Sequence, residues 1–557
     1  MASAPILAVT PQNNGSAFFS RSLSRPLTLA LFAMLAGMHL SMAFGRAINW
    51  DEFFFYGQVE MLARGEFLKP LQTIHTRLFV WIAALPGDEV DHIIVARLFM
   101  LASLGAIGAS IYGVASKFTD KQNAALCSAA YLGAGLVLQH GTSFRVDPMA
   151  AALLSLALLV LARSQMNWFH ALAMGALCGL AAMVTIKVVL WLPAFAAVGV
   201  MQWHERGWDK GYVVRVAASV FAAAASFASL YAFHSMGADP DQANAAAQDI
   251  ASSSIAKMFG FFNTPYLIFM VKGALTAIIL AIGIVLVPFR LAKIDAHWTR
   301  RLAIAGLFFP ILTPFFYHNS APYLYTFILP PVAMACALSM PVLTKRYGAA
   351  AVAAIIALNA AAVWIVDERG MTGAQQEVIG GVHEIFPEPV SYFDCCSMVS
   401  TFSKSNTFRT PWGIERYLAS GRPAMLEAMQ TKPVPLLLAN DTLFTGLFDG
   451  DDAITFHPDD AAALRNTYIP LWGDVFVAGK IVSAGDQLTW NVLVPGTYTV
   501  EGNVLIDGVG HTDGDLVQLD RGDVKLENRD GTEARLLWGA GTKAPSRPFP
   551  EEYWTLF

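Results

Sequence analysis

Two adjacent carboxylates, Asp51 and Glu52, follow the first long apolar stretch of the chain, in the segment NWDEFFFY. The aromatic residues around them would leave these acids poorly solvated at a membrane boundary. A poorly solvated carboxylate holds a proton more readily, which is the property that a general base needs. Acids that merely face water after a membrane span are also common, and the residues alone leave this alternative open.

A second group of charges stands in the motif FRVDP, at the start of a later apolar segment. Asp147 and Pro148 suit a helix N-terminus, where Asp caps the helix and Pro fits the first turn. Arg145 either pairs with Asp147 for structure alone or serves a polar site, since a charge in the membrane costs about 2.5–3.5 kcal/mol. Lys187, in VTIKVVLWLP, either reaches the membrane interface or faces a polar cavity.

Further polar candidates lie in two other segments between apolar stretches. His75 and Arg77 belong to IHTRLF, and His318 and Tyr323 belong to the polar and aromatic run YHNSAPYLY. A single histidine is more often structural than catalytic, but His318 stands beside hydrogen-bonding residues. These positions are candidates for substrate binding.

Together these residues favour chemistry on an anionic, lipid-linked group. Arg, Lys and His side chains suit a phosphate, and a carboxylate suits the removal of a proton from an acceptor hydroxyl. A leaving phosphate that is held by cations needs no metal ion, so we expect no cofactor. A divalent cation held by Asp51 and Asp147 is the less favoured alternative, because the sequence has no cluster with metal-ligand spacing.

The composition indicates that a membrane protein positions these residues. Of 557 residues, 55% are hydrophobic and 14% are charged, with a mean hydropathy of +0.48, whereas soluble proteins carry about 25% charged residues. This excludes a purely soluble enzyme, a disordered protein and a nucleic-acid binder. Residues 367–557 carry 14 Lys and Arg against 27 Asp and Glu, whereas residues 1–366 have a net charge of +8. A basic membrane domain therefore precedes an acidic soluble domain.

About eleven segments approach the roughly 20 apolar residues that a membrane span requires. They are residues 26–45, 93–115, 122–140, 148–163, 169–184, 187–203, 212–234, 265–289, 302–317, 322–343 and 347–366. Basic residues fall in every second loop, from Arg21 and Arg25 before the first span to Lys345 and Arg346 before the last. The N-terminus is therefore predicted to be cytoplasmic and the acidic tail to lie outside, together with all the candidate residues above.

The membrane domain is predicted to occupy residues 26–366, after a cytoplasmic tail at residues 1–25. Its outer loop at residues 46–92 is long and aromatic, so we expect helices that lie in the membrane interface. A second outer segment, residues 235–264, is polar and rich in Ser and Ala, and we expect a mobile loop there.

The acidic tail is predicted to contain two regions. Residues 367–467 form a mixed α/β region, in which PVPLLLAN (433–440) indicates a buried strand that follows a helix. Residues 468–557 alternate in hydrophobicity between Gly and Pro turns, which predicts a small β-sandwich-like unit. Cys395 and Cys396, in the α/β region, could form only a strained vicinal disulfide, so a structural or incidental role is favoured.

Four segments, in order, resemble the GT-C membrane glycosyltransferases, above all the protein O-mannosyltransferase and lipid A aminoarabinose transferase superfamily. They are NWDEFFFY, RVDPMAAALLSLALLVLARS, GLAAMVTIKVVLWLP and HNSAPYLYTFILPP, within about residues 25–366. The resemblance implies a GT-C fold and a polyprenyl-phosphate-linked sugar as donor. It also implies inverting transfer to an acceptor hydroxyl, on a lipid, glycan or protein, at the periplasmic face of a bacterial inner membrane.

The resemblance also assigns roles to individual residues. Asp51 corresponds to the acid that deprotonates the acceptor, with Glu52 as its companion and Asp147 as the second acid of the catalytic set. Arg145 and Lys187 correspond to residues near the donor phosphate, although the spacing from Arg145 to Asp147 is shorter than in the mannosyltransferases.

The remaining candidates match less closely. His318 is a further candidate for the donor phosphate, and His75, Arg77 and Tyr323 are candidates for substrate binding. The segment around His75 lacks the Pro-Pro pair usual at that point of the family's loop, and the run from His318 to Tyr323 replaces an Arg-Tyr found in many members. The acidic tail resembles no family that we identify.

Two other classes of function remain as alternatives. A transporter or flippase of a lipid-linked or acidic solute also needs charges within the membrane, but such proteins usually show two related halves, and this sequence shows no internal repeat. A membrane scaffold with a binding tail would leave the clustered acids and cations unexplained.

Overall fold

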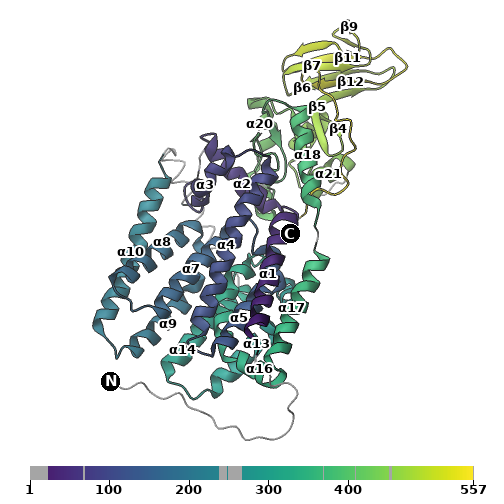
Figure 1. The fold of residues 1–557 in the computed structure, drawn as a ribbon. Coiled ribbons are helices and arrows are strands. Elements are labelled where there is room, and N and C mark those ends of the chain that lie inside the picture. The colour runs from purple at the N-terminus through teal and green to yellow at the C-terminus, as the bar shows by residue number, and fades with distance from the viewer. Residues whose placement is uncertain are drawn as a thin grey trace.

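The computed structural model describes residues 23–66, 69–236, 248, 266–367, 369–407, 409–450 and 455–555. Long helices form a bundle at one end of the molecule, and the β-strands gather at the other end (Figure 1). Short helices and loops join the two parts, and the candidate residues of the outer loop lie in this middle layer.

Six helical segments of the described chain are long and apolar enough to cross a membrane, or up to eight if two bent pairs are single spans. The six are α1 (Arg25–Gly45), α4 (Glu89–Ala115), α7 (Val146–Arg163), a 3-10 turn (Ile186–Trp191) continued by α9 (Leu192–Glu205), α10 (Lys210–His234) and α17 (Ala349–Val366). The bent pairs are α12 (Ile268–Leu275) with α13 (Ile278–Lys293), and α15 (Leu324–Ala335) with α16 (Met340–Tyr347).

All eleven predicted spans are helical, but three of them are too short or too broken to pass the same test. They are α5 (Lys121–Leu132) with α6 (Gly135–His140), α8 (Trp168–Val184), and α14 (Trp298–Phe308) with the 3-10 turn Phe309–Phe315. Gly133 separates α5 from α6, and two prolines lie in the 3-10 turn, where they remove backbone donors. The helix count is therefore roughly consistent with the predicted eleven spans, of which six to eight pass the test of length and composition.

The outer loop contains helices, as predicted. These are α2 (Trp50–Ala63), α3 (Ile74–Phe79) and a 3-10 turn (Val80–Ala84), and they lie at the end of the bundle that faces the strands (Figure 1). The loop predicted to be mobile at residues 235–264 falls almost entirely outside the described residues.

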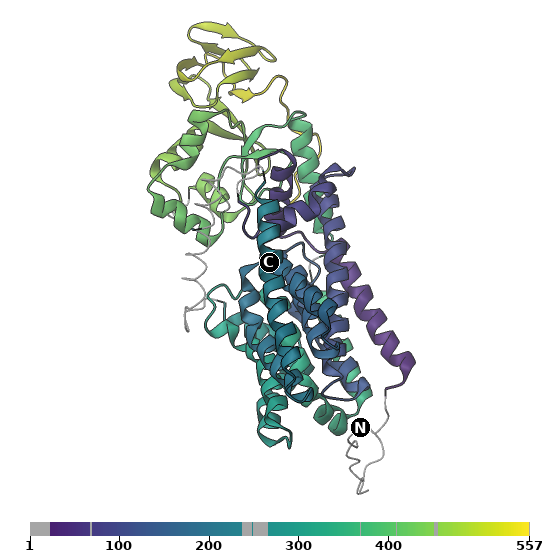
Figure 2. The same cartoon turned by 90° about the vertical axis from the view of Figure 1, so that its left-hand side faces the viewer.

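The soluble part has α18 (Met371–Ile385) next to the bundle and two sheets beyond it (Figures 1 and 2). The larger sheet has the order β10-β7-β12-β5-β3-β1-β2, with β4 also paired to β5, and the smaller has the order β6-β11-β8-β9. The strands are β1 (Ser391–Phe393), β2 (Ser403–Lys404), β3 (Leu436–Leu438), β4 (Tyr468–Trp472), β5 (Val475–Val482), β6 (Gln487–Val492), β7 (Gly496–Glu501), β8 (Val504–Ile506), β9 (Val509–His511), β10 (Leu516–Leu519), β11 (Gly522–Glu527) and β12 (Ala534–Trp538).

The predicted buried strand in PVPLLLAN is β3, which follows α20 (Ala424–Thr431). Its pairing with β5 makes one sheet continuous across the boundary expected at residue 468. Side chains from both sheets, such as Tyr498 and Leu526, share one core, as a sandwich requires. The remaining helices of this part are α19 (Pro411–Ser420), α21 (Thr442–Asp449) and α22 (Pro458–Thr467).

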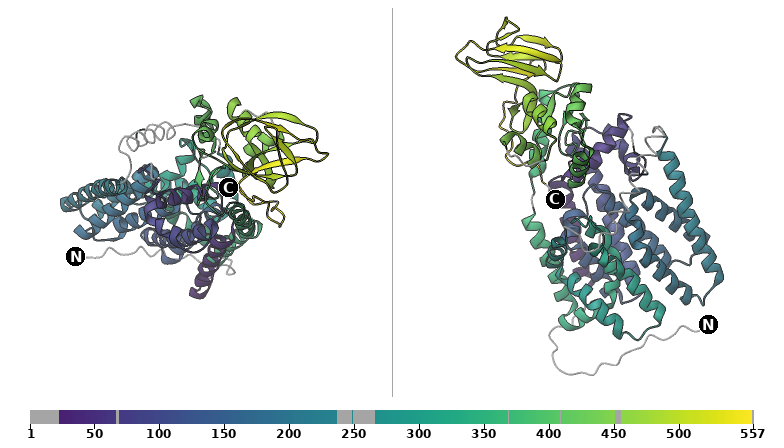
Figure 3. Two further views of the ribbon diagram at one scale, coloured as in Figure 1. Left: turned by 90° about the horizontal axis from the view of Figure 1, so that it is seen from above. Right: turned by 180° about the vertical axis from the view of Figure 1, so that it is seen from behind.

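The soluble part packs tightly on α2 and α4. Phe53 and Ile93 share a core with Val378 of α18. Gly57 of α2 permits this approach, because a Cβ there would lie 2.6 Å from the side chain of Ser397. The start of α2 is therefore held from both sides, by the bundle below and by the soluble domain above (Figure 3).

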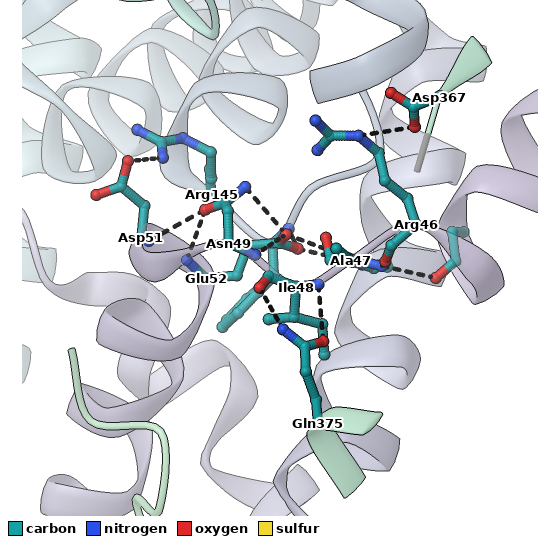
Figure 4. Close-up of polar contacts among 12 residues, drawn as sticks. Arg46, Ala47, Ile48, Asn49, Asp51, Glu52, Arg145, Asp367 and Gln375 are labelled. Atoms are coloured by element: carbon teal, nitrogen blue, oxygen red, sulfur yellow. Dashed lines mark hydrogen bonds and ion pairs between the residues drawn. The ribbon is translucent and has the colours of Figure 1, made fainter. Parts of the chain in front are cut away.

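Two further contacts fix the start of α2. The Gln375 side chain donates to the Ile48 carbonyl (2.8 Å) and accepts from the Ile48 N–H (3.0 Å), as Figure 4 shows. Near the C-terminus, the Trp554 ring stacks on the Trp50 ring with centroids 5.9 Å apart. Trp50, the residue before Asp51, thus packs against Trp554, which lies some 500 positions away in the sequence.

Candidate active site

The first turn of α2 separates the two adjacent carboxylates. The Asn49 side chain accepts hydrogen bonds from the N–H groups of Asp51 (3.0 Å) and Glu52 (3.2 Å). In turn, the Glu52 carboxylate accepts a hydrogen bond from the Asn49 N–H (3.4 Å). This capping box turns Glu52 inward. The Asp51 side chain takes no part in this capping box, and it faces the space beside α2.

Glu52 is a buried structural residue. Its carboxylate forms two bonds to Arg97 of α4 (2.6 and 2.7 Å) and accepts the Phe144 N–H (2.7 Å). Burial by itself would raise the pKa of Glu52, but Arg97 and the Phe144 N–H outweigh it and lower the pKa, so the group stays ionised. The prediction that Glu52 acts with Asp51 in catalysis does not fit this position, because Glu52 faces α4 instead of the site.

Asp51 begins a chain of alternating charges. It pairs with the Arg145 guanidinium, toward which it points in Figure 4. Arg145 lies 3.8 Å from the Asp147 carboxylate, which in turn accepts a 2.6 Å bond from the Lys187 ammonium. The folded chain thus brings together four residues predicted from three separate segments. Of Asp51 and Asp147, Asp51 is the more accessible: 16% of its side chain is exposed, against 1% for Asp147.

Tyr323 forms an aromatic platform under the two cations. Its ring centroid lies 3.4 Å from the Arg145 guanidinium carbon and 5.4 Å from the Lys187 nitrogen. Phe55 covers Arg145 from another side at 5.7 Å. Aromatic faces attract guanidinium and ammonium groups, so the Tyr323 ring helps to hold both cations beside the cavity.

These residues line a cavity of about 380 Å³ at the top of the membrane domain. The wall includes several side chains that we did not predict, from the outer loop, from the end of α8, from the loops before α12 and α15, and from the soluble domain. They are Phe54, Gln58, Lys69, Leu71, Gln72, Thr73, Val184, Thr185, Tyr266, Asn319, Thr410 and Pro411. Lys69 lies within the predicted outer loop, where its charge was a usable signal, whereas no local signal marked Thr410.

His75 lies behind the cavity wall. Its ring packs edge-on against the rings of Phe55 (5.2 Å) and Phe144 (6.2 Å) and is 2% exposed. Burial lowers the pKa of His75 to about 3, so the ring is neutral. The prediction that it binds substrate does not fit, because α3 turns this residue toward the core.

Arg77 and His318 are also outside the described wall of the cavity. Arg77 bonds to the His234 ring (3.0 Å) and to the carbonyls of His234 (3.1 Å) and Met236 (2.8 Å). It therefore joins α3 to the end of α10 and does not fit the predicted substrate role. His318 precedes Asn319, and it is Asn319 that lines the cavity and accepts a bond from the Tyr323 hydroxyl (3.1 Å).

The donor set of the site suits an anion better than a metal ion. Over the described ranges, no three His, Cys, Asp or Glu side chains are grouped as a metal site would need. Asp51 and Asp147, the pair considered for a divalent cation, each contact a cationic side chain. Two cations and a phenol ring beside one accessible carboxylate can bind a phosphate and place a base next to it.

Known proteins share this architecture. A scan against protein-family models finds no match, and a search of curated proteins finds none either. Among solved structures, ArnT from Cupriavidus metallidurans bound to undecaprenyl phosphate is similar with a TM-score of 0.54 and 12% identity, over 76% of this chain and 94% of that chain. The same protein in the apo state gives a TM-score of 0.51 and 12% identity, over 75% and 94%.

ArnT is a GT-C fold glycosyltransferase. At this level of identity the likeness concerns the fold alone, over about three quarters of this chain. A polytopic helical domain followed by a β-rich soluble region was also expected from the sequence. The chain therefore has the GT-C fold of the membrane glycosyltransferases.

Proposed function

We propose that this protein is an inverting glycosyltransferase that moves a sugar from a polyprenyl-phosphate carrier to an acceptor hydroxyl. The observation that carries the proposal is that Asp51, Arg145 and Lys187 line one cavity at the edge of the membrane helices. The binding of undecaprenyl phosphate to ArnT, which has the same fold, supports a polyprenyl-phosphate donor.

In this proposal the donor phosphate lies against Arg145 and Lys187. Charge-assisted hydrogen bonds from a guanidinium and an ammonium hold phosphate strongly. Asp147 touches both cations and orients them, which makes it a positioning residue. Tyr323 supports them from below, and Lys69 adds positive charge at the rim.

Asp51 acts as the base. A phosphate that reaches Arg145 competes with Asp51 for the guanidinium and so frees the carboxylate. The acceptor hydroxyl then gives its proton to Asp51 while its oxygen bonds to the anomeric carbon. The bond between that carbon and the phosphate oxygen breaks, and lipid phosphate leaves with the electron pair. Attack opposite the leaving group inverts the anomeric centre, and the two cations stabilise the leaving charge.

We further propose that the cavity opens at the periplasmic face of a bacterial inner membrane, with a cytoplasmic N-terminus. The basic loops support this orientation. The acceptor is a hydroxyl of a lipid, a glycan or a protein that reaches the cavity beneath the soluble domain. No nucleic acid and no metal cofactor take part in the proposed reaction.

The test is to incubate the purified protein with radiolabelled polyprenyl-phosphate sugars and follow the release of lipid phosphate. Wild type should release it by transfer or by slow hydrolysis, whereas Asp51→Asn should be about 10²–10⁴-fold slower, the usual contribution of a general base. Glu388→Gln, which neutralises an exposed acid on the soluble part, is the matched control. Absence of lipid-phosphate release with every carrier would contradict the proposal.

The transporter alternative predicts a different result. A flippase would move labelled lipid between the leaflets of vesicles without releasing lipid phosphate. If such movement occurred and was unaffected by Asp51→Asn, the transport function would replace the one proposed here.

A further inference from the structure

A second cavity lies within the helical bundle. It shares no lining residue with the candidate active site. It has a volume of about 1040 Å³ and runs between α1, α4 and α5. This exceeds the roughly 300–1,000 Å³ of ordinary small-molecule sites. Its lining on α1 extends from Arg25 to Leu40, a rise of about 23 Å at 1.5 Å per residue, which approaches the roughly 30 Å hydrocarbon core of a bilayer.

The groove is open because small residues face it. Gly37 of α1 and Gly105 of α4 both line it, and neither has a heavy atom within 4 Å of the place where a Cβ would stand. Leu29, which also lines it, is 70% exposed. Figure 2 shows α1 leaning away from the other helices toward the end far from the strands. An apolar groove of this length matches an extended lipid chain better than a polar ligand.

The far end of the groove is positively charged. Arg25 and Lys121 both line it, and within the described residues neither forms an ion pair. A 3.2 Å bond from the Leu23 N–H to the Gln122 side chain holds the starts of α1 and α5 together. Each of these helices begins here, so the positive ends of two helix dipoles add to the two cations. This end suits a phosphate group.

We propose that this groove binds one anionic glycerophospholipid, with an acyl chain between α1 and α4 and its phosphate between Arg25 and Lys121. The lipid belongs to the leaflet opposite the soluble domain. It is distinct from the proposed sugar donor, whose phosphate must lie at Arg145, at the other end of the bundle. The proposal therefore does not depend on glycosyl transfer.

The test is native mass spectrometry of the full chain in mild detergent, titrated with phosphatidylglycerol and with phosphatidylcholine. Wild type should retain one phosphatidylglycerol at least tenfold more tightly than phosphatidylcholine. Combined Arg25→Gln and Lys121→Gln should abolish that preference. Combined Lys345→Gln and Arg346→Gln, which remove two exposed cations from the last turn of α16, should preserve it.

A second pair of substitutions tests the groove itself. Gly37→Leu with Gly105→Leu places side chains in the open space and should weaken both lipids at least tenfold, while size-exclusion elution stays unchanged. Equal binding of the two lipids to wild type would overturn the proposal. So would a retained lipid that proves to be a polyprenyl phosphate. Binding that appears only after residues 1–22 are removed would show that the chain's own N-terminal segment occupies the groove, and would also overturn it.

Discussion

Neutralising each of the two adjacent acids of α2 should have opposite consequences. In Glu52→Gln, Arg97 loses its charge partner although both side chains are at most 1% exposed. Breaking a buried ion pair from one side typically costs about 3–5 kcal/mol. For a cooperative unit of roughly 150–250 residues this lowers Tm by roughly 6–20 °C. In Asp51→Asn, Arg145 keeps Asp147 as a neighbour and the lost carboxylate is 16% exposed, so the cost should be smaller than for Glu52→Gln.

Activity should follow the reverse order. Asp51→Asn should lose lipid-phosphate release about 10²–10⁴-fold while its thermal unfolding stays near that of wild type. Glu52→Gln, assayed at low temperature on the monodisperse fraction, should keep activity within about tenfold of wild type, because its carboxylate does not reach the cavity. Thermal unfolding followed by tryptophan fluorescence and the radiolabel assay together measure both quantities. A stable but inactive Glu52→Gln, or an active Asp51→Asn, would refute the assignment of the two acids.

The same ion pair predicts a pH dependence. The folded pKa of Glu52 lies below its ordinary value of 4.5, so the pair stabilises the fold fully above about pH 4.5. That contribution is lost as the pH falls through the folded pKa. The stability difference between wild type and Glu52→Gln should therefore be constant from pH 8 to about pH 5 and shrink in stronger acid. A difference that grew on acidification would contradict this sign.

The other predictions concern the donor site, the clamp on α2 and the orientation. Lys187→Gln should raise KM for the donor about 10–100-fold, the loss of one hydrogen bond to a charged group, whereas the exposed Lys345→Gln should leave it unchanged. Trp554→Ala removes the ring stacked on Trp50 and should lower stability by about 0.5–1.5 kcal/mol, measured by thermal unfolding; no change would show that the stack does not hold α2. Asn503→Cys, on the exposed soluble part, should react with a membrane-impermeant maleimide added outside intact spheroplasts; labelling only after lysis would reverse the orientation.

Local sequence patterns predicted the helical elements and roughly their number, but not where individual helices are broken. Each predicted span is helical, because apolar runs of this kind satisfy their backbone groups internally. The length of an unbroken helix depends on breaks such as those at Gly133 and Pro310, which a hydropathy count averages away. The continuity of β3 with β5 across the expected boundary was also unpredictable, since strand pairing between distant segments leaves no local signal.

The sequence predicted only part of the candidate site. Asp51, Arg145, Asp147 and Lys187 were recognisable because a charge beside a long apolar run is costly and rarely incidental. His75 lies in the same outer loop as Asp51 and is also a polar residue among apolar ones, yet the structure places it in the core. Whether a polar residue of a short helix faces a cavity or a neighbour depends on how that helix is rotated in the fold.

The sequence by itself determined that this is a basic membrane domain with an acidic β-rich appendage, because hydrophobicity, charge and alternation are summed over many residues and tolerate local error. Only the tertiary structure decided which of the two adjacent acids faces the cavity that Arg145 and Lys187 line. Asp51 and Glu52 differ by one position, about 100° around a helix, and that rotation is set by the Asn49 cap and by Arg97 on another helix. The contact with Arg97 joins residues 45 positions apart in the chain, so no property of either acid alone could reveal it.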